Sequence, residues 1–135
     1  MRLLIDGNII LDVLQDRAPH VGDSAKIWKL CETGRAEGFI SSLTFANLVY
    51  VMRKELSPEK ISEVLKALSL IFRFTDMTAA DLMKAAELQW DDFEDALQYA
   101  AAERIHADHV ITRNAKDFRQ GKITARTPAE FLSGL

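Results

Sequence analysis

The sequence predicts an α/β protein, built as a three-layer α/β/α sandwich around a central parallel sheet. Short apolar runs alternate along the chain with longer segments whose apolar residues recur at helical spacing. This alternation is typical of parallel sheets covered by helices. Two of the apolar runs lead into polar residues, at Asp6 and at Thr112. Open α/β sheets bind their ligands at the carboxyl ends of such strands.

Five short segments have the character of strands, because each is a brief apolar run bounded by turn or capping residues. The strands are expected at residues 2–6, 37–41, 72–75, 109–112 and 124–126. Connections between the predicted elements are short, as in one compact domain.

The remaining segments predict helices, and capping residues mark where most of them begin. Ser57 precedes Pro58, a pair that caps a helix and suits its first turn. Thr78 and Asp81 have the spacing of a capping box, and Asn8 is expected to cap the first helix. The helices are expected at residues 9–17, 21–33, from 42, from 58, 79–89, from the acidic segment 91–95 to 104, and from 128.

Composition predicts one globular domain covering residues 1–135, since 48% of the residues are hydrophobic and 27% are charged. The net charge of −3 excludes a generally basic nucleic-acid-binding surface. The lone Cys31 cannot form an internal disulfide and is expected as a buried thiol in a reducing compartment. Because the chain lacks a signal peptide or an apolar run of membrane-spanning length, we expect a cytoplasmic protein without membrane contact.

Acidic residues occur at three places that the predicted sheet would bring to one edge. Asp6 follows the first strand, four acids lie within residues 91–95, and Asp117 follows the strand at 109–112. Converging carboxylates repel one another unless a cation lies among them, and Mg²⁺ or Mn²⁺ is the usual cation at such sites.

Structural roles also explain several of these acids. Asp92 is well placed as a helix cap, and Asp95 would then lie in the first turn, where the helix dipole favours an acid. Asp117 can equally serve as a turn residue, and Glu94 is expected to be solvated. Asp6 is the hardest to explain structurally, because an acid directly after a buried strand is costly unless it is paired or metal-bound.

Other polar residues are less informative. The three histidines lack the spacing of a zinc site, and the serines near residue 41 are expected to cap a helix. A group of cations next to Asp117 either binds phosphate or forms a solvated basic loop. It consists of Arg113, Lys116, Arg119 and Lys122.

Three segments resemble motifs of PIN-domain nucleases. Residues 4–14 resemble the opening motif, in which an Asp is followed by a small residue and Asn. Residues 92–98 and 111–118 resemble the third and fourth motifs. Order, spacing and chain length also agree, so the resemblance extends over essentially the whole chain.

The resemblance implies metal-dependent cleavage of RNA by the toxin of a toxin–antitoxin pair of the VapC type. It implies Mg²⁺ or Mn²⁺ as cofactor, an antitoxin protein as partner, and a homodimer. Carried over by position, Asp6 and Asp95 would be metal ligands, and the fourth acid would map to Asn114 or to Asp117. By the same correspondence Asn47 belongs to the site, and Thr112 would orient the loop or bind a water. We further expect Asn8, Thr112, Arg113 and Lys116 to bind substrate, with Arg113 and Lys116 at the backbone phosphates.

Two departures from the family pattern matter. Gly7 replaces the usual Thr or Ser and removes a hydroxyl, and Asn47 replaces an acid and removes a charge, which should lower metal affinity. A weakened or inactive module that binds RNA or a protein partner is therefore the alternative to a nuclease. A phosphoryl-accepting Asp, as in haloacid-dehalogenase-like phosphatases, fits less well, because Asn8 stands where a second acid would be needed.

Overall fold

The computed structural model describes residues 1–118 and 121–135, and its centre is a five-stranded sheet in the order β3-β2-β1-β4-β5. All four strand pairs are parallel. The strands are β1 (Arg2–Ile5), β2 (Glu37–Ser41), β3 (Arg73–Thr75), β4 (His109–Ile111) and β5 (Thr124–Arg126). The prediction of a central parallel sheet is confirmed, with each strand within one residue of its expected bounds.

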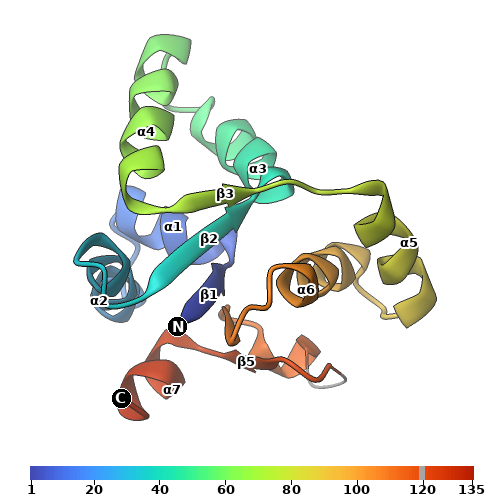
Figure 1. The fold of residues 1–135 in the computed structure, drawn as a ribbon. Coiled ribbons are helices and arrows are strands. Elements are labelled where there is room, and N and C mark those ends of the chain that lie inside the picture. The colour runs from blue at the N-terminus through green and yellow to red at the C-terminus, as the bar shows by residue number, and fades with distance from the viewer. Residues whose placement is uncertain (119–120) are drawn as a thin grey trace.

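Helices cover both faces of this sheet and complete the three-layer α/β/α architecture (Figure 1). They are α1 (Gly7–Leu14), α2 (Val21–Glu32), α3 (Ser42–Met52), α4 (Pro58–Ile71), α5 (Ala79–Leu88), α6 (Phe93–Arg104) and α7 (Pro128–Ser133), with the 3-10 helix η1 (Ala115–Phe118). Helix α6 packs on one face with η1, and α5 packs against α6. Helices α1, α2, α3, α4 and α7 pack on the other face.

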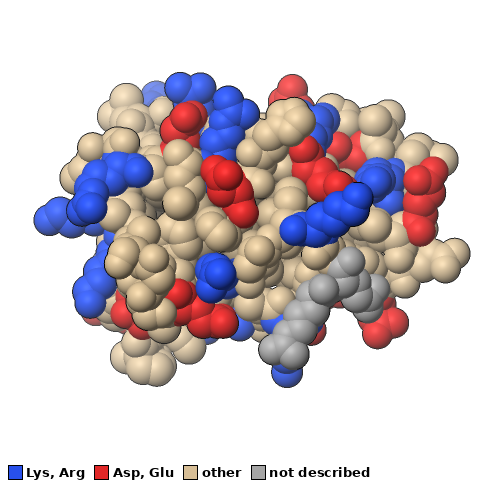
Figure 2. All heavy atoms as spheres, turned by 60° about the horizontal axis from the view of Figure 1, so that its bottom comes forward, with Lys and Arg blue, Asp and Glu red and all other residues tan. Residues whose placement is uncertain are grey.

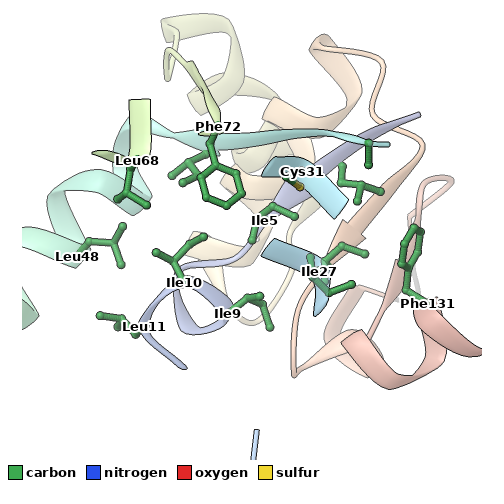
Figure 3. Close-up of a cluster of buried hydrophobic side chains, with 14 of the residues drawn as sticks. Ile5, Ile9, Ile10, Leu11, Ile27, Cys31, Leu48, Leu68, Phe72 and Phe131 are labelled. Carbon is green, nitrogen blue, oxygen red and sulfur yellow. The ribbon is translucent and has the colours of Figure 1, made fainter. Parts of the chain in front are cut away.

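The hydrophobic core is divided by the sheet because successive side chains of a strand point to opposite faces. Leu3 and Ile5 of β1 belong to the cluster under α1 and α2, which Figure 3 shows with Ile9, Ile27 and other side chains around Ile5. Leu4 belongs to the second cluster, with Tyr99 of α6. A central parallel strand is buried on both faces, which explains its uninterrupted apolar run.

Most of the predicted caps are confirmed. The side chains of Ser41 and Ser57 cap α3 and α4, and Thr78 and Asp81 form the capping box of α5. The predicted cap of α1 is wrong: Asp6 occupies the N-cap position and Asn8 lies inside the helix. Helix α1 also ends at Leu14, earlier than expected, and the chain then turns through a positive φ of 49° at Asp16.

Several large apolar side chains are exposed rather than buried in the core. Phe93 is 48% exposed, since it occupies the first position of α6 next to the loop. The large exposed apolar side chains of the described residues lie at the termini and at Tyr50, Leu70, Phe74, Leu82, Met83 and Phe93.

The strand register positions the polar residues at the edge of the sheet. Ile5 of β1 is paired with Ile111 of β4, so Asp6 and Thr112 leave neighbouring strands at the same level. Within residues 1–118 and 121–135, none of the helices combines the length and the apolar character that crossing a membrane requires.

Candidate active site

Asp6 is held at the carboxyl end of β1 by a hydrogen bond from the neighbouring strand. The Thr112 hydroxyl Oγ1 donates to Asp6 Oδ2 over 2.9 Å. The same Oγ1 accepts a bond of 3.1 Å from the backbone N–H of Asn114. Thr112 is 0% exposed, so its hydroxyl orients both Asp6 and the loop after β4.

The surroundings of Asp6 oppose its ionisation. Burial raises the pKa of this carboxyl, and the hydrogen bond from Thr112, the backbone amide of Gly7 and the charge of Arg113 offset the increase in part. A buried carboxylate with a raised pKa is stabilised in its charged form by a cation placed next to it.

Asp95 lies in the first turn of α6 and belongs to the same site. Its backbone N–H donates to Asp92 Oδ1 over 3.1 Å, which confirms Asp92 as the cap of the helix. Burial raises the pKa of Asp95 to about 7, together with the negative charges of Asp92, Asp6, Asp117 and Glu94. Carboxylates at the end of β1, at the start of α6 and in η1 therefore act on Asp95 across the site.

An inner pocket of about 190 Å³ lies between α1, α3 and α6. We use this name for the hollow whose polar lining residues are Asp6, Asn8, Thr44, Asn47, Glu94, Asp95 and Gln98. The structure thus brings together the two acids that sequence reasoning placed first, Asp6 and Asp95. It also brings Asn8 and Asn47 to the same place.

A second hollow adjoins the first, and Glu94 lines both. This outer hollow of about 640 Å³ is lined by Trp90, Asp91, Asp92, Phe93, Glu94, Lys116 and Asp117. Lys116 and Asp117 are both exposed there. Asp117 therefore lines the outer hollow rather than the inner pocket, and its role as a metal ligand stays a prediction.

The other predicted residues have varied surroundings. Asn114 is exposed on the loop after β4, and Asn8 Oδ1 accepts a long bond of 3.5 Å from Arg17. Arg113 lies 3.5 Å from the Oδ1 of Asp12, a fully buried acid of α1. Arg119, predicted near phosphate, lies outside the described residues.

Three residues with a part in or near the site were missed by sequence reasoning. Asp12 is buried against Ser24, whose hydroxyl donates to Asp12 Oδ2 over 2.9 Å, and it ties Arg113 to α1. Glu94 is exposed, as expected, but it also lines the inner pocket, which was not expected. Gln98 lies four residues after Glu94 and three after Asp95, so helical spacing was the available signal.

The two departures from the family pattern have structural counterparts. A side chain at Gly7 would place its Cβ 3.3 Å from Thr44 Cγ2, so glycine lets the start of α1 approach α3 closely. Asn47 Nδ2 donates to Glu94 Oε1 over 3.4 Å, across the inner pocket from α3 to α6. The missing acid at position 47 therefore has a carboxylate directly opposite.

The donor atoms of the inner pocket fit a hard divalent cation. Asp6, Glu94 and Asp95 offer carboxylate oxygens, and the buried Gln98 Oε1 has no hydrogen-bond partner among the described residues. In the arrangement that the structure shows, residues 1–118 and 121–135 contain no group of three His, Cys, Asp or Glu side chains that could hold a metal ion, so amide oxygens and waters would have to complete the coordination. Mg²⁺ and Mn²⁺ suit such a site, because Mg²⁺ commonly keeps several waters beside one or two carboxylates.

Surface charge around the molecule is mixed. On the face shown in Figure 2, the described Lys and Arg side chains alternate with Asp and Glu side chains and form no continuous stripe. This agrees with the net charge of −3. Because this face has no continuous basic surface, attraction of a polyanion to the protein would depend on individual cations such as Lys116.

A family model described as the PIN domain matches residues 2–116. The match covers most of the chain, including Asp6 and helices α1, α3 and α6, which line the inner pocket. The chain belongs to the PIN-domain family. No curated protein sequence matches it.

Solved structures of toxin–antitoxin proteins share the fold. A toxin–antitoxin complex from Klebsiella pneumoniae matches with a TM-score of 0.72 at 22% identity, over 93% of this chain and 97% of that chain. VapBC2 from Rickettsia felis, bound to a promoter DNA fragment, matches at 0.67 and 18%, over 94% and 98%. VapC20 from Mycobacterium tuberculosis, a toxin that cleaves the sarcin-ricin loop, matches at 0.70 and 14%, over 88% and 95%. The expected PIN-like fold, similar to VapC toxins, is confirmed.

Proposed function

We propose that this protein is a Mg²⁺- or Mn²⁺-dependent endoribonuclease that hydrolyses phosphodiester bonds of RNA. The observation that carries the proposal is the sharing of one pocket by Asp6 and Asp95, both with raised pKa values. Burial disfavours the charged form of both carboxyls, repulsion by neighbouring carboxylates adds to this at Asp95, and binding a cation removes that penalty. Membership in the PIN-domain family and the fold of an RNA-cleaving toxin lend further support.

Residues of the site would bind the cation, hold its carboxylate ligands in one orientation and attract the RNA. Asp6 and Asp95 would hold the cation, and Thr112 keeps the Asp6 carboxylate in one orientation through its hydrogen bond. A bound divalent cation supplies Lewis acidity and lowers the pKa of water. Lys116, which lines the outer hollow, would attract the phosphates of the RNA backbone, and this attraction would make RNA binding sensitive to salt.

Exchanging Asp6 for Asn tests this assignment. The amide has nearly the same shape and can still accept the Thr112 hydrogen bond, so we expect the fold to persist. Isothermal titration with Mn²⁺ should show weakened binding, and an RNA cleavage assay should show loss of metal-dependent cutting. Unchanged cleavage by purified, folded Asp6→Asn would refute the role of this pocket.

We further propose that the protein acts as a toxin with an antitoxin partner, as a single domain in the cytoplasm that forms a homodimer. The support comes from the shared fold with proteins solved as toxin–antitoxin complexes. Exposed apolar residues on α3, α4 and α5 offer surface for such partners. Light scattering of the purified protein, alone and with a candidate antitoxin, measures both associations, and a monomer in both samples would refute them.

A module that binds RNA without cutting it is the second candidate, and the amide at Asn47 favours it. Such a protein would retain RNA in a gel-shift assay in the presence of EDTA. It would also leave the RNA intact when Mg²⁺ or Mn²⁺ is added. Metal-dependent cutting by the wild type excludes this candidate.

A further inference from the structure

Glu94 and Asn47 face each other across the inner pocket. Asn47 belongs to α3 and Glu94 to the first turn of α6, and Asn47 Nδ2 donates to Glu94 Oε1 over 3.4 Å. Both residues line the pocket together with Asp6 and Asp95. The two positions are 47 residues apart in the sequence, so this pairing depends on the packing of α3 beside α6.

An amide and a carboxylate are a compatible pair at this distance, whereas two carboxylates are not. An acid at position 47 would repel Glu94 and also Asp6 and Asp95, and the charge of Asp6 already helps to raise the pKa of Asp95. Asn47 instead donates a hydrogen bond and directs the Glu94 side chain toward the pocket. The carboxylate that is missing at position 47 of α3 is thus supplied at position 94 of α6, on the opposite side of the inner pocket.

A second observation points to a ligand at the same place. Gln98 lies one turn after Glu94 on α6 and is 8% exposed. Its Nε2 donates to Thr44 Oγ1 over 2.6 Å, while its buried Oε1 lacks a hydrogen-bond partner among the described residues. A buried oxygen without a donor is costly, and a hydrated cation in the pocket would supply one.

We propose that Glu94 is the third acidic ligand of the cation site, in place of the acid expected at Asn47, and that Asn47 is a positioning residue for Glu94. This inference rests on the proposed function, because it concerns the same site. Glu94 is exposed, so its side chain can turn toward a cation without disturbing the core. Together with Asp6 and Asp95 it supplies three negative charges, and waters complete the coordination.

Titration with Mn²⁺ of the wild type and two variants tests the role of Glu94. Glu94→Gln should weaken Mn²⁺ binding by about tenfold or more, the size of effect seen when groups at metal sites are removed. Asp91→Asn is the matched control, since Asp91 is an exposed acid of the same segment that lines the outer hollow. It should change the affinity by less than about threefold, because solvent screens its charge.

A double variant tests the exchange of roles between the two positions. In Asn47→Asp with Glu94→Gln, the acid and the amide change sides while the net charge of the pocket stays that of the wild type. We expect this variant to recover most of the Mn²⁺ affinity lost in Glu94→Gln. Thermal unfolding in EDTA should be similar for all variants, which shows that they are folded.

Each outcome decides a different point. If Glu94→Gln bound Mn²⁺ as tightly as the wild type, the role of Glu94 would be overturned. RNA cleavage by the wild type would in that case still support the proposed function. A double variant as weak as Glu94→Gln would overturn the pairing with Asn47. Mn²⁺ binding without RNA cleavage by the wild type would refute the proposed function and leave Glu94 to be judged by titration. A wild type that binds no Mn²⁺ would refute both.

Discussion

At the two ends of helix α6 lie two carboxylates, Asp95 and Asp81, in opposite electrostatic surroundings. At its start, Asp95 is surrounded by the acids Asp6, Asp92, Asp117 and Glu94, and its pKa is raised to about 7. Near its end, Arg104 Nε binds both carboxylate oxygens of Asp81, on α5, over 3.1 Å.

Asp81 shows what a structural acid requires. Burial raises its pKa, but the hydrogen bonds from Arg104 and from the backbone of Thr78 outweigh burial, so the pKa is lowered. Arg104 also donates to Thr75 Oγ1 over 3.1 Å and links α6 to the end of β3. Asp81 is neutralised within the protein, whereas Asp95 is surrounded by acids, whose repulsion a bound cation would offset under the proposed function. That difference separates an acid that stabilises the fold from one that is available for chemistry.

The largest expected effect is the loss of catalysis at the start of α6. Asp95→Asn should reduce metal-dependent RNA cleavage by at least about 100-fold, because even the partners of metal ligands contribute 10- to 100-fold. In EDTA at pH 8 the variant should be no less stable than the wild type, since a repelled charge has been removed. Initial cleavage rates and thermal unfolding measure the two effects. A less stable variant would show that Asp95 is a structural acid like Asp81.

The next largest effect belongs to the ion pair at the other end of the helix. Arg104→Met should lower the free energy of unfolding by about 2 kcal/mol, because it leaves the carboxylate of Asp81 buried without its main donor. The estimate is below that for a fully buried pair, since the Arg104 side chain is 36% exposed. Urea unfolding at pH 7 measures it. Stability equal to that of the wild type would show that water replaces Arg104.

The pH dependence of stability should differ in sign between the two acids. Asp81 has a lowered pKa, so its contribution is present above the unfolded value near 3.8 and is lost as the pH falls through the folded pKa. Asp95 has a raised pKa, so the metal-free protein should lose stability as the pH rises from about 4 to about 7.

Urea titrations in EDTA across this pH range measure both contributions. Asp95→Asn should remove the decrease toward neutral pH, and Asp81→Asn should remove part of the decrease at acid pH. Each slope stays below about 1.4 kcal/mol per pH unit, the limit for one proton. Solvent screening reduces it further for the half-exposed Asp95. Parallel curves for Asp95→Asn and the wild type would refute the assignment.

The smallest effect is expected for an ion pair on the surface. Arg73 Nε and Glu37 Oε2 are 3.5 Å apart, with side chains 71% and 44% exposed. Arg73→Ala should change the free energy of unfolding by less than about 0.5 kcal/mol, because exposed pairs gain little. The same urea assay compares it with Arg104→Met. A loss of similar size would show that charge pairing, rather than burial, explains the effect at Arg104.

Much of the fold could be predicted from local sequence. The alternation of strands and helices, the strand bounds and the caps at Ser57, Thr78 and Asp92 depend on residues close together in the chain. The cap of α1 was misplaced because Asp6 and Asn8 are both good capping residues. Which of them begins the helix depends on where β1 stops pairing with β4. That pairing involves residues more than 100 positions away.

The site was predictable in part for the same reason. Asp6 and Asp95 follow recognisable local patterns, a strand that leads into an acid and an acid in the first turn of a helix. Glu94 was expected to be solvated and is exposed, but its place in the lining of the inner pocket was not expected. Its contact with Asn47 depends on the packing of α3 beside α6, which no local pattern describes. Two expectations stay predictions: that residues 1–135 form a single domain, and that Asp117 is a metal ligand.

Local order along the chain was thus sufficient for the class of fold, the positions of the elements and the acids at their ends, since apolar periodicity and capping act over a few residues. Three-dimensional packing was needed to show that Asp81 has a cation, that Asp95 has acids around it, and that Glu94 lies opposite Asn47. The physical reason is that the charge state of a buried acid is set by desolvation and by neighbours within a few ångströms. Those neighbours come from elements that are distant in the sequence.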